Sequence, residues 1–199
     1  MRDLSQSRDG TKLLYTASRN GNENVVMRDL VTGEETQLTH YPRGDDFATA
    51  PIFSPDASRI AYTSISVDSV LHIVSLQTRE DRPLIQGQAP LDWSKDGRFI
   101  LLGWTPARNR MNYSVLSIDN VEVKKLKLEL RYDKSDCCFS PDAQYVSYSD
   151  NGHLYLYHID TDKIIELTNG STEDEQPLWC PDGKTILFLS RRAFGPERE

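Results

Sequence analysis

Apolar residues recur at every second position in short segments of this sequence, and each segment follows a polar turn. Five such turns occur, and the segments that follow them can be aligned. In this alignment one column after the turn is always aliphatic, and the column two residues later is aromatic or leucine. The first column holds Leu13, Ile60, Ile100, Val146 and Ile186, and the second holds Tyr15, Tyr62, Leu102, Tyr148 and Phe188. Side chains two residues apart lie on one face of a strand, and this composition is typical of half-buried strands. The pattern therefore predicts a β-strand after each turn.

The five turns share one four-residue motif. Its copies are Ser7-Arg8-Asp9-Gly10, Ser54-Pro55-Asp56-Ala57, Ser94-Lys95-Asp96-Gly97, Ser140-Pro141-Asp142-Ala143 and Cys180-Pro181-Asp182-Gly183, at intervals of 47, 40, 46 and 40 residues. Pro presets φ for an early turn position, and Asp hydrogen-bonds the backbone two residues on. We therefore expect the Ser and Asp side chains to tie the turn together rather than to act in catalysis. Because Ala57 and Ala143 replace Gly, we expect that this position does not demand left-handed geometry in every copy.

Further strands complete each repeat. Third strands are predicted over 25–30, 70–76, 113–118 and 154–159, and fourth strands end near Leu38-Thr39 and Leu167-Thr168, with weaker counterparts at 84–85 and 126–128. No window shows a sustained helical pattern, so we expect little helix. A period of about 40 to 50 residues with four antiparallel strands is typical of a propeller blade. The sequence predicts an all-β propeller of four complete blades and about half of a fifth.

We expect one propeller domain over 1–199, forming part of a larger or incompletely closed ring. The approximate blade boundaries are 1–43, 44–87, 88–131, 132–172 and a partial blade at 173–199.

The motif resembles the TolB-type β-propeller repeat, a relative of the WD repeat. An aromatic residue precedes the turn in Phe53-Ser54-Pro55-Asp56, Phe139-Ser140-Pro141-Asp142 and Trp179-Cys180-Pro181-Asp182-Gly183, and the resemblance covers essentially the whole chain. It implies partners held at one face of the ring, in the manner of an envelope complex. Propellers of this type also cap prolyl-oligopeptidase-type peptidases, whose catalytic triad lies in a separate hydrolase domain.

Composition excludes several classes of partner. The 199 residues carry a formal net charge of −7, which argues against nucleic acid and anionic membranes because both attract basic surfaces. No segment has about 18 consecutive apolar residues, so no membrane insertion is expected. The polar N-terminus carries no signal-peptide core. We therefore expect a cytoplasmic location if the chain is complete, and a periplasmic one if it is a fragment of a TolB-like protein.

Candidate catalytic and metal-binding motifs are missing from the sequence. No Gly-x-Ser-x-Gly string occurs, and a serine hydrolase of the α/β type usually needs one. The four histidines are not spaced as metal ligands, and Cys137, Cys138 and Cys180 form neither a Cys-x-x-Cys pair nor a disulfide framework. We expect no catalytic residues, no metal and no cofactor.

Acidic residues cluster in the linkers that enter three of the predicted first strands. The candidate partner-binding rim consists of Asp45, Asp46, Asp136, Asp174 and Glu175. If these loops meet at the channel mouth, their carboxylates favour a cationic peptide or a basic protein surface. Solvated polar loops are the competing interpretation.

The main prediction is a non-catalytic propeller that binds a protein or peptide at the channel-mouth loops. The alternative is a regulatory or substrate-gating propeller of a larger enzyme, either a prolyl-oligopeptidase-type peptidase or a bacterial Ser/Thr kinase with this domain as sensor. A third possibility is a lectin-like or small-ligand propeller, which requires an aromatic and polar pocket at the channel.

Overall fold

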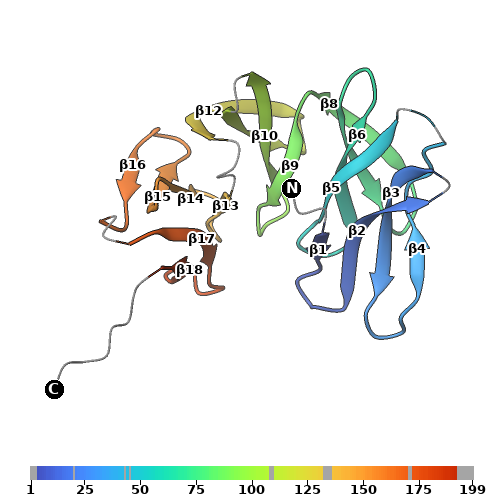
Figure 1. Ribbon diagram of the computed structural model, residues 1–199, viewed down its shortest axis with the longest axis horizontal. Coiled ribbons are helices and arrows are strands. Elements are labelled where there is room, and N and C mark those ends of the chain that lie inside the picture. Colours follow the sequence, from blue (N-terminus) through green and yellow to red (C-terminus); the bar gives the residue numbers. More distant parts are fainter. Residues whose placement is uncertain are drawn as a thin grey trace. The chain divides into compact units, whose positions relative to one another are not determined.

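Strands are the only regular elements in the part of the chain that the computed structural model describes, which is residues 4–19, 21–42, 44, 46–107, 110–131, 136–169 and 172–191. Figure 1 shows them as successive small antiparallel sheets in chain order. Four sheets have four strands and the fifth has two. This confirms the predicted fold class of four complete blades and a partial one.

The first two sheets contain β1 to β8. Their bounds are β1 (Leu4–Gln6), β2 (Lys12–Arg19), β3 (Asn22–Asp29), β4 (Glu35–Gln37), β5 (Phe47–Phe53), β6 (Arg59–Ile65), β7 (Val70–Ser75) and β8 (Asp81–Gln86). The third sheet has β9 (Ala89–Trp93), β10 (Phe99–Ala107), β11 (Arg110–Ser117) and β12 (Glu122–Arg131). Each sheet keeps its strands in sequence order, as short hairpin connections require.

The remaining sheets lie toward the C-terminus. The fourth contains β13 (Cys138–Phe139), β14 (Tyr145–Asp150), β15 (His153–His158) and β16 (Ile164–Glu166), and the fifth pairs β17 (Asp174–Trp179) with β18 (Ile186–Ser190). The predicted third strands thus correspond to β3, β7, β11 and β15. In β12 the apolar residues Leu126 and Leu128 are buried while Lys127 is exposed, so this strand alternates between core and solvent.

The chain divides into two compact units. Unit 1 is Met1–Trp104 with Tyr113–Lys125, and unit 2 is Thr105–Asn112 with Leu126–Glu199. The expected single domain over 1–199 stays a prediction.

Consecutive sheets of unit 1 pack against each other through apolar side chains, many of them on the second strand of each sheet. Leu14 of β2 lies in one buried cluster with Phe53, Ile60 and Tyr62 of the next sheet. Ala61, one residue after Ile60, lies in a second cluster with Trp93, Ile100 and Leu102 of the sheet that follows. Neighbouring residues of one strand therefore face opposite sheets, as the alternation of side chains requires.

The fourth position of the turn motif is left-handed in all five copies. Gly10, Gly97 and Gly183 have φ of 73°, 76° and 68°, and Ala57 and Ala143 have φ of 53° and 57°. The expectation that alanine relaxes this position was wrong. The N–H of this residue bonds the carbonyl of the motif's first residue in every copy, and this shared hydrogen bond fixes the backbone whether or not a Cβ is present.

Candidate functional site

The turn motif uses its polar side chains within the turn itself. In four copies the Ser hydroxyl donates to Asp Oδ1 at 2.6–2.7 Å and accepts the N–H of the residue five positions later at 2.9 Å. Asp Oδ1 also accepts the N–H two residues on, at 2.9–3.1 Å in all five copies. These bonds confirm the prediction that Ser and Asp hold the turn together.

In the fifth copy the aspartate holds the turn together although no serine is present. Cys180 occupies the serine position, and Asp182 Oδ1 accepts the Thr185 N–H directly at 3.0 Å while the Thr185 hydroxyl donates to Asp182 Oδ2 at 2.8 Å. The aspartate is therefore the constant part of the motif and the serine is replaceable.

The turn carboxylates are held in the ionised form. The Ser7 hydroxyl and then the Thr11 N–H lower the pKa of Asp9 to about 2, and the Ser54 hydroxyl and the Ser58 N–H do the same for Asp56. A carboxylate with so low a pKa is a poor general base at neutral pH. The low pKa values of these carboxylates and the hydrogen bonds within the turn therefore both indicate a structural role for the motif.

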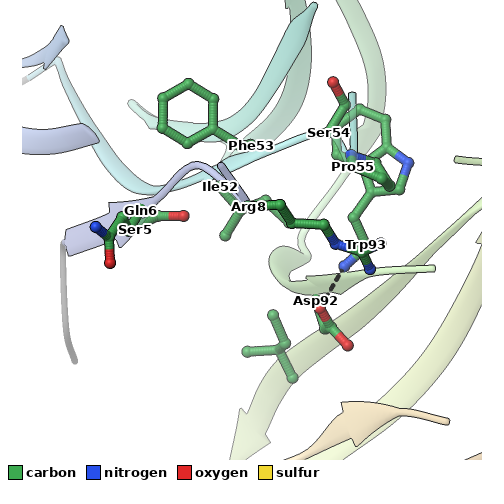
Figure 2. A pocket seen from close by; sticks show the side chains of 10 residues that line it. Ser5, Gln6, Arg8, Ile52, Phe53, Ser54, Pro55, Asp92 and Trp93 are labelled. Carbon is green, nitrogen blue, oxygen red and sulfur yellow. Dashed lines mark hydrogen bonds between the residues drawn. The ribbon is translucent and has the colours of Figure 1, made fainter. Parts of the chain in front are cut away.

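A pocket of about 180 Å³ lies in unit 1, at the ends of the first strands of three consecutive sheets. Its lining comes from β1, β5 and β9 and from the turns after the first two of these strands. The lining residues are Ser5, Gln6, Arg8, Ile52, Phe53, Ser54, Pro55, Leu91, Asp92 and Trp93 (Figure 2). Pairing is irregular between Thr49 and Ile52 of β5 and at the lining residue Leu91 of β9, and such bulges re-aim side chains next to sites.

The pocket combines opposite charges with aromatic walls. Phe53 and Trp93 are buried, and the Trp93 indole N–H donates to the Gly97 carbonyl at 3.1 Å, which fixes the ring. Figure 2 shows the Arg8 side chain extending toward Asp92 and Trp93. Pockets for small ligands usually measure about 300–1,000 Å³, so this pocket is smaller than that range.

Sequence reasoning did not single out this pocket, although the sequence carried a signal. The second motif position is Pro in three copies, but it is Arg8 in the first copy and Lys95 in the third. A cation in place of a turn-forming Pro is unexplained by turn chemistry. Arg8 lines the pocket, and Lys95 does not belong to its lining.

The five predicted rim residues are placed differently from one another. Asp45 lies outside the described residues. Asp46 is exposed before β5 in unit 1, and Asp136 is exposed before β13 in unit 2. Glu175 is half-buried in β17. Because these residues belong to two units, the rim that would join them stays a prediction.

Asp174, the remaining rim residue, is committed to internal bonds. Its side chain is 1% exposed and accepts hydrogen bonds from the hydroxyls of Thr172 and Ser190, and its N–H bonds the Gly152 carbonyl. This arrangement ties the start of β17 to β18 and to the β14–β15 hairpin. The geometry assigns Asp174 to the support of this part of unit 2.

Ser64, His72 and Asp81 form a chain of hydrogen bonds across β6, β7 and β8. His72 Nδ1 lies 2.8 Å from Asp81 Oδ1, and Ser64 Oγ lies 3.1 Å from His72 Nε2. Tyr62 stacks on His72 and donates to Asp81 Oδ2 at 2.7 Å. Burial opposes ionisation of Asp81, but the bonds from His72 and Tyr62 outweigh it and hold the pKa of Asp81 below its usual value.

This chain has the connectivity of a Ser-His-Asp triad but not its setting. Ser64 is 6% exposed near the end of β6, where it pairs with Val70, and none of the three residues lines the pocket of unit 1. A nucleophile must be reachable and must face oxyanion donors. We interpret the network as a tie between three strands of one sheet. Sequence reasoning missed it because the residues stand on separate strands and meet only through cross-strand pairing.

The described residues offer neither a metal site nor a membrane-spanning helix. Among the described residues, no three His, Cys, Asp or Glu side chains gather as a metal site. The three cysteines are free thiols, and Cys138 Sγ contacts Ser147 Oγ at 3.1 Å. Over the same residues there is no helix long and apolar enough to span a bilayer.

Comparison with known proteins gives remote relatives over nearly the whole chain. No protein-family model matches the sequence. It is 25% identical over 197 residues to an uncharacterized peptidase, YuxL, of Bacillus subtilis, covering 94% of this chain and 29% of that protein. It is 23% identical over 205 residues to the Tol-Pal system protein TolB of Francisella tularensis, covering 96% of this chain and 46% of that protein. The chain thus spans less than half the length of either relative.

Solved structures agree on the architecture. TolB of Acinetobacter baumannii superposes with a TM-score of 0.66 at 18% identity, covering 92% of this chain and 47% of that one. An oligogalacturonate lyase in complex with manganese gives a TM-score of 0.71, also at 18% identity, covering 96% and 59%. The protein is therefore a β-propeller. Its propeller is of the TolB type, as the motif resemblance predicted, and the enzyme among its neighbours shows that this fold also occurs in catalysts.

Proposed function

We propose that this chain is a non-catalytic propeller segment that binds a protein or peptide partner, with the pocket at β1, β5 and β9 as a contact point. The observation that carries the proposal is the pocket itself: an arginine and an aspartate stand beside buried aromatic rings. Arginine is among the residues that dominate binding energy at protein interfaces, and Arg8 is exposed at this pocket. The relative named for the Tol-Pal system supports a protein partner.

Two exposed carboxylates and one half-buried carboxylate extend this proposal within each unit. Asp46 in unit 1, and Asp136 and Glu175 in unit 2, offer negative charge to a basic segment of the partner. Asp45, which is next to Asp46 in the sequence, is also part of the proposed partner-binding rim. Asp174 contributes indirectly, because it supports β17. Reversal of the charges at the exposed residues Asp46 and Asp136 to lysine should weaken binding of a basic peptide without lowering the melting temperature. Glu34→Lys, a reversal at an exposed hairpin residue, is the control.

The pocket is tested with peptides selected on the chain itself. Linear peptides are selected by phage display, and their affinities for the wild type, Arg8→Ala and Lys95→Ala are measured by titration calorimetry. Both cations occupy the same motif position, but Arg8 alone of the two lines the pocket. We expect Arg8→Ala to weaken binding at least tenfold and Lys95→Ala to change it less than twofold. Equal effects of the two variants, or a failure to select any peptide, would contradict the proposal.

A second candidate function is favoured by the relative YuxL, a peptidase of which this chain matches 29%. In that case the propeller gates or filters substrate for a hydrolase domain encoded in the same reading frame. The flanking gene sequence tests this directly. A neighbouring in-frame domain with Gly-x-Ser-x-Gly would support the gating function, and flanks that encode no hydrolase would contradict it.

A further inference from the structure

Arg8 is the only cation among the residues that line the pocket at β1, β5 and β9. Its side chain is exposed, and among the residues that the structure describes it makes no hydrogen bond or ion pair. Figure 2 shows this side chain extending toward Asp92 and Trp93. A guanidinium carries five N–H donors in a fixed planar fork and no acceptor. The pocket therefore presents a strong donor group to whatever enters it.

The carboxylates in the turns beside the pocket are used within their own turns. Asp9 Oδ1 accepts two hydroxyls and one backbone N–H at 2.6–3.0 Å. Asp56 accepts two hydroxyls at 2.6 and 2.8 Å and one backbone N–H at 3.1 Å. Neither carboxylate forms an ion pair with Arg8 in the described part of the chain. The acceptor that matches the Arg8 fork must therefore come from a partner.

Asp92 is the other charged residue that lines the pocket, and it is bonded to the chain. Asp92 is half-buried, and its Oδ1 accepts the Trp93 N–H at 2.8 Å. Arg8 is exposed by contrast. Of the two charges in the pocket, the positive one is therefore the more accessible to a partner.

Arg59 adds a second positive charge at the Trp93 wall. Its Cζ atom lies 5.3 Å from the centroid of the Trp93 ring, which is the geometry of a cation–π contact. A lysine or arginine of a partner would have to compete with Arg59 for this face of the ring, and Arg8 would repel it as a like charge. A negatively charged group is attracted by both guanidinium groups instead.

A carboxylate suits these surroundings better than a phosphate group does. Its two oxygens accept two parallel N–H bonds from a guanidinium. A phosphorylated side chain carries about −1.5 to −2 charges at pH 7, and its extra charge would be repelled by Asp92 and by the ionised turn carboxylates of Asp9 and Asp56. The site therefore favours a group with one negative charge.

From these observations we propose that the pocket binds a carboxylate of the partner and that Arg8 is the residue that receives it. The carboxylate belongs to an aspartate or glutamate side chain or to the partner's C-terminus, and the Arg8 fork donates to both of its oxygens. Phe53 and Trp93, which line the same space, contact the carbon atoms next to the carboxylate. This inference rests on the proposed function, because it names the chemical group that enters the same pocket.

Peptides selected on the chain are the probes, and those that lose at least tenfold in affinity with Arg8→Ala are kept. Each is made again with every Asp changed to Asn and every Glu to Gln, one at a time, and separately with an amidated C-terminus. One of these changes should weaken binding to the wild type about tenfold or more in titration calorimetry, because it removes the charge that Arg8 pairs with. A side-chain amide that causes the loss identifies an acidic residue, and the amidated end identifies a terminal carboxylate.

The same titrations separate this inference from the proposed function. If no single change costs more than about twofold, the inference is overturned, while the loss with Arg8→Ala still supports a peptide site at the pocket. If no selected peptide is weakened by Arg8→Ala, the proposed function fails and the inference fails with it.

Exchange of the two charges tests direct contact with a side-chain carboxylate. Arg8→Glu should weaken the peptide about tenfold or more, and lysine in place of the peptide's acidic residue should restore binding to Arg8→Glu but not to the wild type. Lys95→Glu makes the same change of charge at the same motif position outside the pocket lining, and it should leave affinity within about twofold. Equal losses with Arg8→Glu and Lys95→Glu would overturn the proposal.

Asp92→Asn tests the sign of the bound charge for either source of the carboxylate. Asparagine keeps an oxygen that can accept the Trp93 N–H but removes the negative charge, so binding of a carboxylate should be unchanged or tighter. A loss of about tenfold or more would show that Asp92 receives a cationic group, and would overturn the proposal. Thermal denaturation confirms that the variant is folded, and if it is not, the peptide series on the wild-type chain decides.

Discussion

Ala57 and Ala143 stand in a backbone conformation that normally favours glycine. An alanine in the left-handed region costs about 1–2 kcal/mol through the contact between its Cβ and the backbone. The other three copies avoid this cost with Gly10, Gly97 and Gly183. The turn motif is therefore slightly strained in two of its copies, and its hydrogen bonds outweigh that strain.

Substitutions at this position should move stability in opposite directions. Ala57→Gly relieves strain at φ 53° and should raise the free energy of unfolding by about 0.5–1 kcal/mol, after allowance for the greater freedom of glycine in the unfolded chain. Gly97→Ala should lower the free energy of unfolding by about 1 kcal/mol because alanine is strained in the left-handed conformation. No steric clash adds to this cost, because the nearest atom to the new Cβ is Arg59 Nη2 at 3.9 Å. Urea denaturation measures both. A destabilised Ala57→Gly would contradict the account.

The turn aspartates make stability depend on pH. The pKa values of Asp9 and Asp56 are about 2, and those of Asp96, Asp142 and Asp182 are also lowered. The ordinary pKa of an unfolded Asp is about 3.9. A depressed folded pKa adds stability that is fully present above the unfolded value and is lost as pH falls through the folded value.

We therefore expect the free energy of unfolding to decrease steadily as pH is lowered from about 5 to 2. Asp56→Asn removes one of the responsible carboxylates, so its stability should depend less steeply on pH over this interval. Chemical denaturation at a series of pH values measures the slopes, and an unchanged slope in Asp56→Asn would contradict the interpretation.

At the scale of strands and sheets, most of the structure follows from the sequence pattern. The alternation of apolar residues located the second strands, and the aromatic residues before the turns located the ends of the first strands, such as Phe53 and Trp93. The bulges in β5 and β9 were not predicted, because they depend on pairing with the neighbouring strand rather than on local composition. These bulges help to place the pocket, so the pocket was missed as well.

Equivalent leucines in β2 and β18 should differ in their contribution to stability. Leu14 is fully buried between two sheets, and Leu187 occupies the same column with more than half of its surface exposed. Leu14→Ala should cost about 2–5 kcal/mol because it leaves a cavity. Leu187→Ala should cost less than about 0.5 kcal/mol, as surface substitutions do. Thermal and urea denaturation compare the two, and a similar cost for both would show that Leu187 is covered.

At the scale of the whole chain, the repeat motif explains the architecture and leaves function to residues that depart from it. Arg8 departs from the motif by replacing Pro, and it lines the pocket. The acidic linkers could be recognised from sequence, but the burial of Asp174 could not. Its burial depends on Thr172 and Ser190, and Ser190 reaches it only through the pairing of β17 with β18.

The central claim is that the pocket at β1, β5 and β9 receives a partner's side chain. Nuclear magnetic resonance of the isotopically labelled chain, titrated with a peptide selected on it, tests this claim most directly. The account predicts that the largest shifts fall on the Trp93 indole N–H and on the amides of Arg8, Ser54 and Asp92, and that Arg8→Ala abolishes them. Saturable binding with shifts elsewhere and none at these four residues would contradict it.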